Sequence, residues 1–258
     1  MPRLDASTAE KIIHILQSVE KILVITGAGI SAESGLPTYR GIGGLYHERQ
    51  TEDNMPIETA LSGHMMRMKP EISWKYIAQI EAACRGATFN RAHEVIVEME
   101  DQFEKVCVLT QNVDGFHRAA GSRNVIDIHG DIHDLYCLKC RYRTTVKDYA
   151  ELEIPPHCPD CGSTVRPDVV LFGEMLPGWK YHNLMKQLQD GFDVVFSIGT
   201  SSLFPYIAAP VINAKIIGIP TIEINPGHSE VSDVVDLKIE AKAAETLDQL
   251  WNMFQHSS

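Results

Sequence analysis

Four cysteines near the middle of the chain stand in two short pairs. Cys137-x-x-Cys140 and Cys158-x-x-Cys161 are separated by 17 residues, a spacing at which four thiolates can close around one Zn²⁺ ion. All four ligands would be sulfur, which leaves no coordination position for water. The pattern therefore predicts a structural zinc site that performs no chemistry. The alternative is a group of four buried free thiols.

A second candidate site lies where an apolar run ends in glycines. Residues 22–26 form this run, and residues 27–32 read Gly-Ala-Gly-Ile-Ser-Ala. Glycines after a strand let backbone N–H groups approach a pyrophosphate at the start of the next helix, although they can also serve packing alone. A dehydrogenase would need an acidic residue about 20 positions on to hold the ribose. That stretch contains Gly43, Tyr46 and Glu48 without a second strand end, which disfavours a plain dehydrogenase.

Polar side chains follow two further apolar runs. Asn112 and Asp114 come just after residues 106–110, and His129 comes directly after residues 125–128. Open parallel sheets bind ligands beyond the carboxyl ends of their strands, although Asn and Asp also form turns. A histidine can act as a base near neutral pH. The chain has eleven histidines, and a lone one is more often structural.

Short apolar runs alternate with helical patterns along the chain. Strands are expected at residues 22–26, 106–110, 125–128, 194–198 and 221–224, and helices at residues 8–20, 93–100 and 243–254. Strands that are apolar on both faces indicate a parallel sheet covered by helices on each side. The prediction is an α/β fold with a Rossmann-like, dinucleotide-binding domain over residues 1–41, 92–134 and 166–258. A helical, methionine-rich insertion is expected at 42–91 and a zinc-ribbon module at 135–165.

Composition and charge restrict the classes of partner that the protein is expected to bind. The hydrophobic fraction is 44% and the charged fraction 22%, as in ordinary globular proteins. A net charge of -11 argues against a nucleic-acid partner. This acidic balance suits lysine-bearing peptides, but it equally serves solubility. We see neither a secretory signal nor an apolar run of about 18 residues that could span a membrane, so a cytoplasmic enzyme is expected.

The glycine-rich turn continues as Glu-Ser-Gly-Leu-Pro-Thr-Tyr-Arg-Gly over residues 33–41. This stretch resembles the sirtuin signature, Gly-Ala-Gly-x-Ser followed by Ser-Gly-Ile-Pro-x-Phe-Arg, with Leu36 in place of isoleucine and Tyr39 in place of phenylalanine. Further sirtuin-like blocks follow in family order: residues 110–114, 129–130, the two cysteine pairs, 166–174, 199–201 and 224–225. The ordered blocks span nearly the whole chain.

The resemblance implies a role for each matching residue. His129 would be the catalytic base, with Asn112 and Asp114 around the nicotinamide amide. The NAD-binding residues would be Gly27, Ala28, Gly29, Ala32, Tyr39, Arg40, Gln111, Asn112, Asp114, Gly199, Thr200, Ser201 and Asn225. The substrate-binding residues would be Val169, Val170, Phe172 and Gly173, which pair with an extended peptide, together with Ile77 and Ile80 in the insertion. A plain core strand is the alternative for residues 169–173, and an ordinary surface cation is the alternative for Arg40.

The resemblance also implies an activity. Sirtuins are NAD-dependent protein-lysine deacylases, which cleave NAD to nicotinamide and O-acyl-ADP-ribose while freeing the lysine; deacetylation is the expected case here. The alternatives are a protein ADP-ribosyltransferase and a non-catalytic NAD-sensing module. The partners would be acyl-lysine proteins or peptides. The sequence leaves the oligomeric state open and is compatible with a monomer.

The acyl preference follows from one segment. Sirtuins specialised for acidic acyl groups carry a Tyr-x-x-Arg pair in the helical insertion, and Ile77 and Ile80 stand at those two positions here. A shift by one residue places Tyr76 at the tyrosine position but Gln79 at the arginine position. No cation is supplied in either register, so we expect weak desuccinylase and demalonylase activity. Arg67 and Arg85 flank the segment and could reach the pocket only if the insertion folds differently from that of the family.

Overall fold

The computed structural model describes residues 4–36 and 51–257. Its largest element is a six-stranded sheet in the order β3-β2-β1-β7-β8-β9, in which every pairing is parallel. The strands are β1 Lys21–Thr26, β2 Lys105–Thr110, β3 Val125–Asp127, β7 Val194–Ile198, β8 Thr221–Ile224 and β9 Leu237–Ile239. The central strands are buried almost throughout, as a sheet covered on both faces requires.

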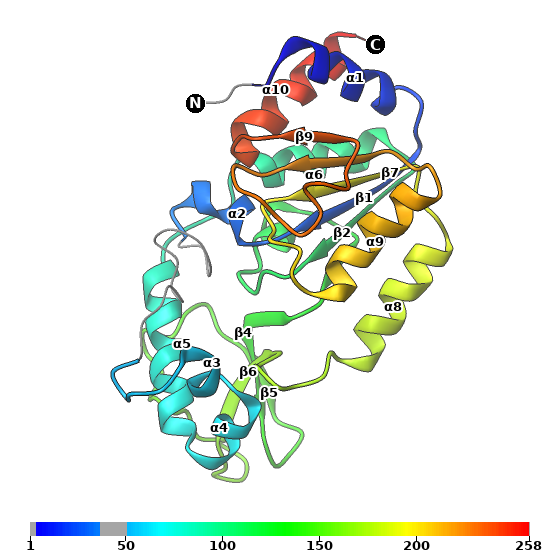
Figure 1. The fold of residues 1–258 in the computed structure, drawn as a ribbon. Helices are drawn as coiled ribbons and strands as arrows, with labels where there is room; N and C mark the ends of the chain where they lie inside the picture. The colour runs from blue at the N-terminus through cyan, green and yellow to red at the C-terminus, as the bar shows by residue number, and fades with distance from the viewer. Residues whose placement is uncertain (1–3, 37–50, 258) are drawn as a thin grey trace.

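Helices cover both faces of this sheet (Figure 1). One face packs against α1 (Ala6–Leu16), α6 (Arg91–Gln102) and α10 (Ala243–His256), and the other against α8 (Gly178–Gln189) and α9 (Pro205–Ile216). The start of α1 is fixed by Asp5, whose side chain accepts a hydrogen bond from the Thr8 amide at 2.9 Å. Such caps satisfy amides that the first helical turn leaves free. Three short helical turns follow the carboxyl ends of β1 and β2: α2 (Ala28–Ser31) and η1 (Ala32–Ser34) after β1, and α7 (Phe116–Ala120) after β2.

A smaller region lies beyond the carboxyl edge of the large sheet (Figure 1). It combines α3 (Ile57–Ala60), α4 (Gly63–Met68) and α5 (Pro70–Cys84) with an antiparallel sheet in the order β5-β4-β6. The strands are β4 Gly130–Cys137, β5 Arg143–Thr145 and β6 Val165–Val169. The indole of Trp74 in α5 is fully buried and donates to the Val165 carbonyl at 2.9 Å. This bond joins the helical segment to the small sheet.

The predicted parallel sheet with helices on both faces is confirmed. Sequence patterns did not reveal β9, α8, α9 or the small sheet. Two strands of the small sheet cross the bounds predicted for the zinc module: β4 begins before residue 135, and β6 continues beyond residue 165. Among the described residues, no helix is long and apolar enough to cross a membrane.

Candidate functional site

Two glycine-containing loops meet at the carboxyl edge of the large sheet. The Gly27 amide donates to the Ile198 carbonyl at 3.2 Å, and the Gly29 amide donates to the Gly199 carbonyl at 2.8 Å. A Cβ added at Gly29 would lie 2.6 Å from the Gly199 Cα, and one at Gly27 would lie 2.8 Å from the Thr200 Cβ. Close packing of the two loops is therefore sufficient to require these glycines.

Asn112 and Asp114 converge on Ser31 from the loop after β2. The Asn112 Nδ2 donates to the Gly27 carbonyl at 3.1 Å and lies 3.2 Å from the Ser31 Oγ. The Ser31 hydroxyl donates to Asp114 Oδ2 at 2.7 Å. Burial raises the pKa of the Asp114 carboxyl, while hydrogen bonds from the Phe116 amide and Ser31 oppose this rise. These contacts place the polar groups of two strand ends side by side.

A second set of polar contacts links the loops after β2, β7 and β8. The Gln111 Nε2 donates to Thr200 Oγ1 at 2.7 Å, and the Asn225 Nδ2 donates to the Thr200 carbonyl at 2.8 Å. Thr200 is buried, whereas Ser201 and Ala32 are exposed. The three loops therefore form one hydrogen-bonded rim. Tyr39 and Arg40, also expected at the cofactor, lie outside the described residues.

His129 lies in the turn between the large and the small sheet. Its Nδ1 is 3.0 Å from the Gln111 carbonyl oxygen, and its Nε2 is 2.7 Å from the Tyr206 hydroxyl. Burial lowers the pKa of His129 and the charge of Lys180 lowers it further, while the bond to Gln111 opposes the shift. The imidazole is therefore neutral at pH 7, the form in which a histidine can accept a proton.

Gly130 makes the turn after His129 feasible. Its φ is +94°, and a Cβ there would lie 1.8 Å from the Asp168 carbonyl oxygen. A larger residue could not fit between β4 and β6. The His-Gly pair thus combines a candidate base with the one residue type that lets the chain cross into the small sheet.

A cavity of about 230 Å³ opens beside the Asn112 cluster. Of the predicted site residues, Ala28, Asn112, Asp114 and Ile80 line it. Sequence reasoning assigned no role to further lining residues, among them Ser31, Leu36, Glu81, Cys84, Phe116, Ile132 and His133. Arg85, expected to reach the pocket only through a different fold of the insertion, also lines the cavity. Ser31 is a fixed position of the glycine-rich signature and could have been found there. Leu36 also belongs to that signature stretch, whereas the others come from α5, α7 and β4, and nothing in their spacing marks them.

The segment predicted to hold a peptide runs from the end of β6. Val169 pairs with Gly130, and the Val170 amide donates to the His129 carbonyl at 2.8 Å. The Phe172 amide donates to the Leu61 carbonyl at 3.0 Å. Val169, Val170 and Phe172 are half-buried and Gly173 is exposed. One edge of the segment is thus already paired within the chain and lies directly beside His129.

A buried ion pair supports this segment. Arg166 donates through Nη1 to Glu174 Oε1 at 2.7 Å and through Nη2 to the Val169 carbonyl at 2.6 Å. Glu174 Oε2 accepts from the Leu171 amide at 2.9 Å. The side chains of Arg166 and Glu174 therefore bridge both ends of residues 169–174, a role that the sequence alone did not suggest.

The two insertion residues Ile77 and Ile80 lie on α5. Ile77 is buried, and Ile80 is half-buried at the cavity wall. The Tyr76 hydroxyl donates to Asp53, and the Arg85 guanidinium pairs with both carboxylate oxygens of Glu81. The Tyr76 hydroxyl and the Arg85 cation are thus each held by an acidic side chain of the protein.

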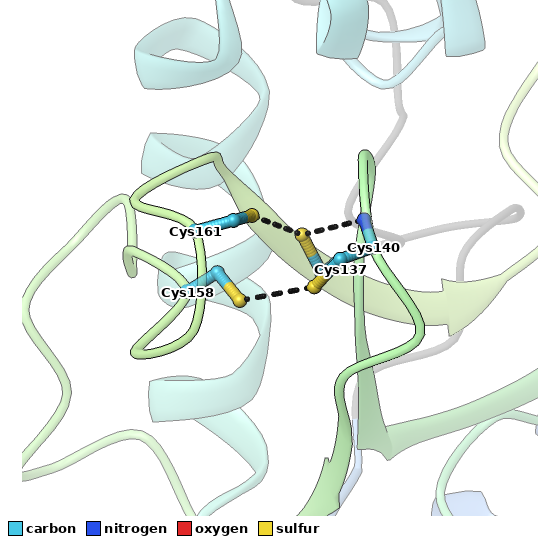
Figure 2. Close-up of side chains that lie close together, drawn as sticks. All are labelled: Cys137, Cys140, Cys158 and Cys161. Carbon is cyan, nitrogen blue, oxygen red and sulfur yellow. Dashed lines mark hydrogen bonds between the residues drawn. The ribbon is translucent and has the colours of Figure 1, made fainter.

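The four paired cysteines come together in the small region (Figure 2). Their sulfur atoms all lie within 4.8 Å of one another, and the Cys137–Cys161 and Cys140–Cys158 sulfur pairs are each 3.5 Å apart. Four sulfurs at Zn–S distances of about 2.3 Å would lie roughly 3.8 Å from each other. The cluster therefore fits a tetrahedral zinc ion. Cys84 and Cys107 lie outside it, and burial raises their thiol pKa to about 11 and about 12.

Comparison with known proteins agrees with this arrangement. Residues 27–204 match the family model described as the Sir2 family. The chain belongs to the Sir2 family. A Pseudomonas aeruginosa relative of this Sir2 protein, NAD-dependent protein deacylase 2, is 46% identical over 93% of this chain and 94% of its own length.

Solved Sir2 structures share the fold. A complex of a Sir2 homologue with NAD superposes with a TM-score of 0.86 at 33% identity, covering 99% of this chain and 96% of that one. A second Sir2 structure, with a deacetylated p53 peptide and 3′-O-acetyl ADP-ribose, has a TM-score of 0.83 at 26% identity, covering 95% and 97%. The fold prediction and the family resemblance are both confirmed.

Proposed function

We propose that this chain is an NAD-dependent protein-lysine deacylase that acts on acyl-lysine proteins or peptides. The observation that carries the proposal is the neutral, partly buried His129 at the carboxyl edge of the sheet, joined through Gln111 to Thr200. It is supported by the deacylase relative at 46% identity. NAD supplies the ribosyl group that accepts the acyl group, and the chain must position both substrates and move a proton.

The residue roles proposed here combine this arrangement with the resemblance to sirtuins. Asn112 and Asp114, which border the cavity with Ala28, would bind the nicotinamide end. Gly27, Gly29, Ala32, Gln111, Gly199, Thr200, Ser201 and Asn225, with Tyr39 and Arg40, would hold the rest of the dinucleotide. This proposal is supported by the lining of the cavity, which combines the polar side chains of Asn112 and Asp114 with the apolar side chains of Phe116 and Ile132. His129 Nε2 would then take a ribose hydroxyl proton.

The rest of the chain would serve this reaction. Residues 169–173 would pair with the substrate peptide as an added strand, which gives affinity with little demand on sequence. We assign residues 1–41, 92–134 and 166–258 to the NAD-binding domain, 42–91 to the insertion and 135–165 to the zinc module. A structural zinc would be held by Cys137, Cys140, Cys158 and Cys161. A cytoplasmic location stays a prediction.

The acyl group would be apolar, with acetyl the first expectation. Ile77 and Ile80 present hydrocarbon, and burying a carboxylate against it without a partner is costly. Arg85 is already paired with Glu81. Lys147 also borders the cavity, but it is exposed and lies beside Asp148. Succinyl and malonyl groups would therefore find no dedicated cation.

The decisive experiment is an assay with NAD and one peptide carrying different acyl-lysines. Nicotinamide release and deacylated peptide should appear together, and mass spectrometry should detect O-acyl-ADP-ribose. Protein-bound ADP-ribose without loss of the acyl group would instead indicate an ADP-ribosyltransferase. NAD binding without turnover on any peptide would indicate a sensing module.

A further inference from the structure

The Tyr206 hydroxyl is hydrogen-bonded to Nε2 of His129, the nitrogen that the proposed reaction needs. Tyr206 is the second residue of α9, and its hydroxyl lies 2.7 Å from His129 Nε2. Its ring stacks on Phe204, with centroids 5.4 Å apart and planes 11° apart. Both rings meet the His129 imidazole edge-on, at 5.6 Å for Phe204 and 5.9 Å for Tyr206. The imidazole is therefore held by two aromatic rings and by a hydrogen bond at each nitrogen.

The partners of the two ring nitrogens fix the position of the proton. The Gln111 carbonyl can only accept, so His129 Nδ1 carries the hydrogen and donates to it at 3.0 Å. In the neutral ring Nε2 is then an acceptor. Burial raises the pKa of Tyr206 to about 12, so its hydroxyl keeps its proton and donates to Nε2. The lone pair of the proposed base is thus already engaged.

The groups that face His129 come from three parts of the fold. Gln111 follows β2, Phe204 and Tyr206 belong to the start of α9, and Lys180 lies in α8. The Lys180 ammonium is held by the Asp127 carbonyl at 2.7 Å and by the Asp127 carboxylate at 3.0 Å. Its charge acts on His129 from a distance, whereas Tyr206 is in direct contact with the ring.

We propose that Tyr206 is a positioning residue that caps Nε2 of His129 in the unliganded enzyme and yields it to the ribose hydroxyl of NAD. The proposal rests on the function proposed above. The cap keeps the imidazole in one tautomer and one orientation, with Nε2 directed at the start of α9. Binding of NAD must exchange one hydrogen bond to Nε2 for another, so the cap weakens NAD binding while it preorganises the base.

The test is Tyr206→Phe, which removes the hydroxyl and retains the ring that stacks on Phe204. Tyr181→Phe on the exposed side of α8 is the matched control. Histidine-labelled protein without NAD is titrated by NMR to follow His129. A hydroxyl that donates to Nε2 stabilises the neutral ring, so its loss should raise the pKa of His129 relative to the wild type and to Tyr181→Phe.

A second measurement is the NAD affinity, by calorimetry without peptide. Because no cap has to be displaced, Tyr206→Phe should bind NAD roughly two- to tenfold more tightly, the range for one neutral hydrogen bond. Zinc content and thermal unfolding check that the variant is folded. An unchanged pKa of His129, or weaker binding of NAD, would overturn the proposal. Neither measurement needs turnover, so both remain decisive if no acyl-lysine peptide is deacylated.

Discussion

The two regions of this molecule are stabilised in different ways. In the large sheet, β1, β2, β7 and β8 are nearly fully buried between two helical layers. In the small sheet, β5 is largely exposed and β4 is buried at only three of its eight positions. The apolar cluster of the small region includes Cys137 and Cys158 themselves.

This difference assigns different tasks to the two regions. Buried apolar strands give the large sheet a core that needs no cross-link, and its carboxyl edge can therefore carry polar groups without loss of the fold. The small sheet is less buried, and we expect its stability to depend on a bound metal, as it does in small metal-binding modules generally. Yet it positions residues 165–174 beside His129. Unfolding of the small sheet should therefore lower activity indirectly, by displacing these residues.

The largest expected effect comes from removing zinc. Chelation or Cys137→Ser should abolish activity and unfold the small sheet, because three thiolates cannot complete the site. Hydrogen exchange should show loss of protection in β4, β5 and β6 while β1 and β2 stay protected. Cys107→Ala, outside the cluster, should keep stoichiometric zinc by metal analysis. An active, zinc-free Cys137→Ser enzyme would show that neither the small sheet nor the activity requires zinc.

The next largest effect is expected from replacing His129, which lies at the carboxyl edge of the large sheet. His129→Ala should lower kcat/KM for deacylation by about 10²–10⁴-fold, the usual contribution of a positioned base, and retain zinc and NAD binding. His182→Ala, at an exposed position of α8, is the control. Steady-state kinetics decides the matter, and near-wild-type turnover of His129→Ala would exclude His129 as the base.

A smaller effect concerns the acyl group, where the two regions meet. A succinyl carboxylate would lose a charge-assisted contact worth about 1.5–3 kcal/mol, so kcat/KM for succinyl-lysine should be about 10- to 150-fold below that for acetyl-lysine on one peptide. The double variant Ile77→Tyr/Ile80→Arg should reduce the difference in kcat/KM between acetyl-lysine and succinyl-lysine. Succinyl-lysine processed as fast as acetyl-lysine would contradict the apolar assignment.

The smallest effect is an acid sensitivity of the large-sheet region. Burial lowers the pKa of His93 from 6.5 to about 4, and its ring faces His117 at 4.8 Å. Below pH 6.5 the unfolded chain binds a proton that the folded chain excludes, so stability falls as the pH decreases toward 4. Between pH 7 and pH 5 His93 should cost about 2 kcal/mol.

Urea unfolding at both pH values tests this. His93→Gln should reduce the pH-dependent fall in the free energy of unfolding by about that amount, while the exposed His182→Gln should leave it unchanged. Comparing each variant with the wild type cancels the contributions of His129 and Asp114, whereas the pKa of His117 also depends on His93 and its contribution changes with the substitution. An equal fall in wild type and His93→Gln would show that His93 is protonated in the folded state as readily as in the unfolded chain.

Local patterns determined most of the large sheet. The five expected strands each coincide with an observed strand to within one or two residues, because continuous apolar runs flanked by glycine and polar residues have few other stable arrangements. The cysteine pairs were equally informative, since ligand spacing restricts how a chain can surround one metal ion. β9 was missed because it has only three residues, too few for a periodic signal.

Contacts between distant segments were decided by the tertiary structure alone. Tyr206 lies 77 residues from His129, and no motif joins them; the packing of α9 against β7 and β8 brings its first turn to His129. The same holds for Glu81 and His133 at the cavity, and for Arg166 beside residues 169–174. Sequence spacing describes neighbours along one element, whereas these pairs depend on how helices pack across a sheet. The sequence by itself thus specified the chemistry at each strand end and the four zinc ligands, and only the packing of α5, α8 and α9 against those ends decided which side chains face the base and the cavity.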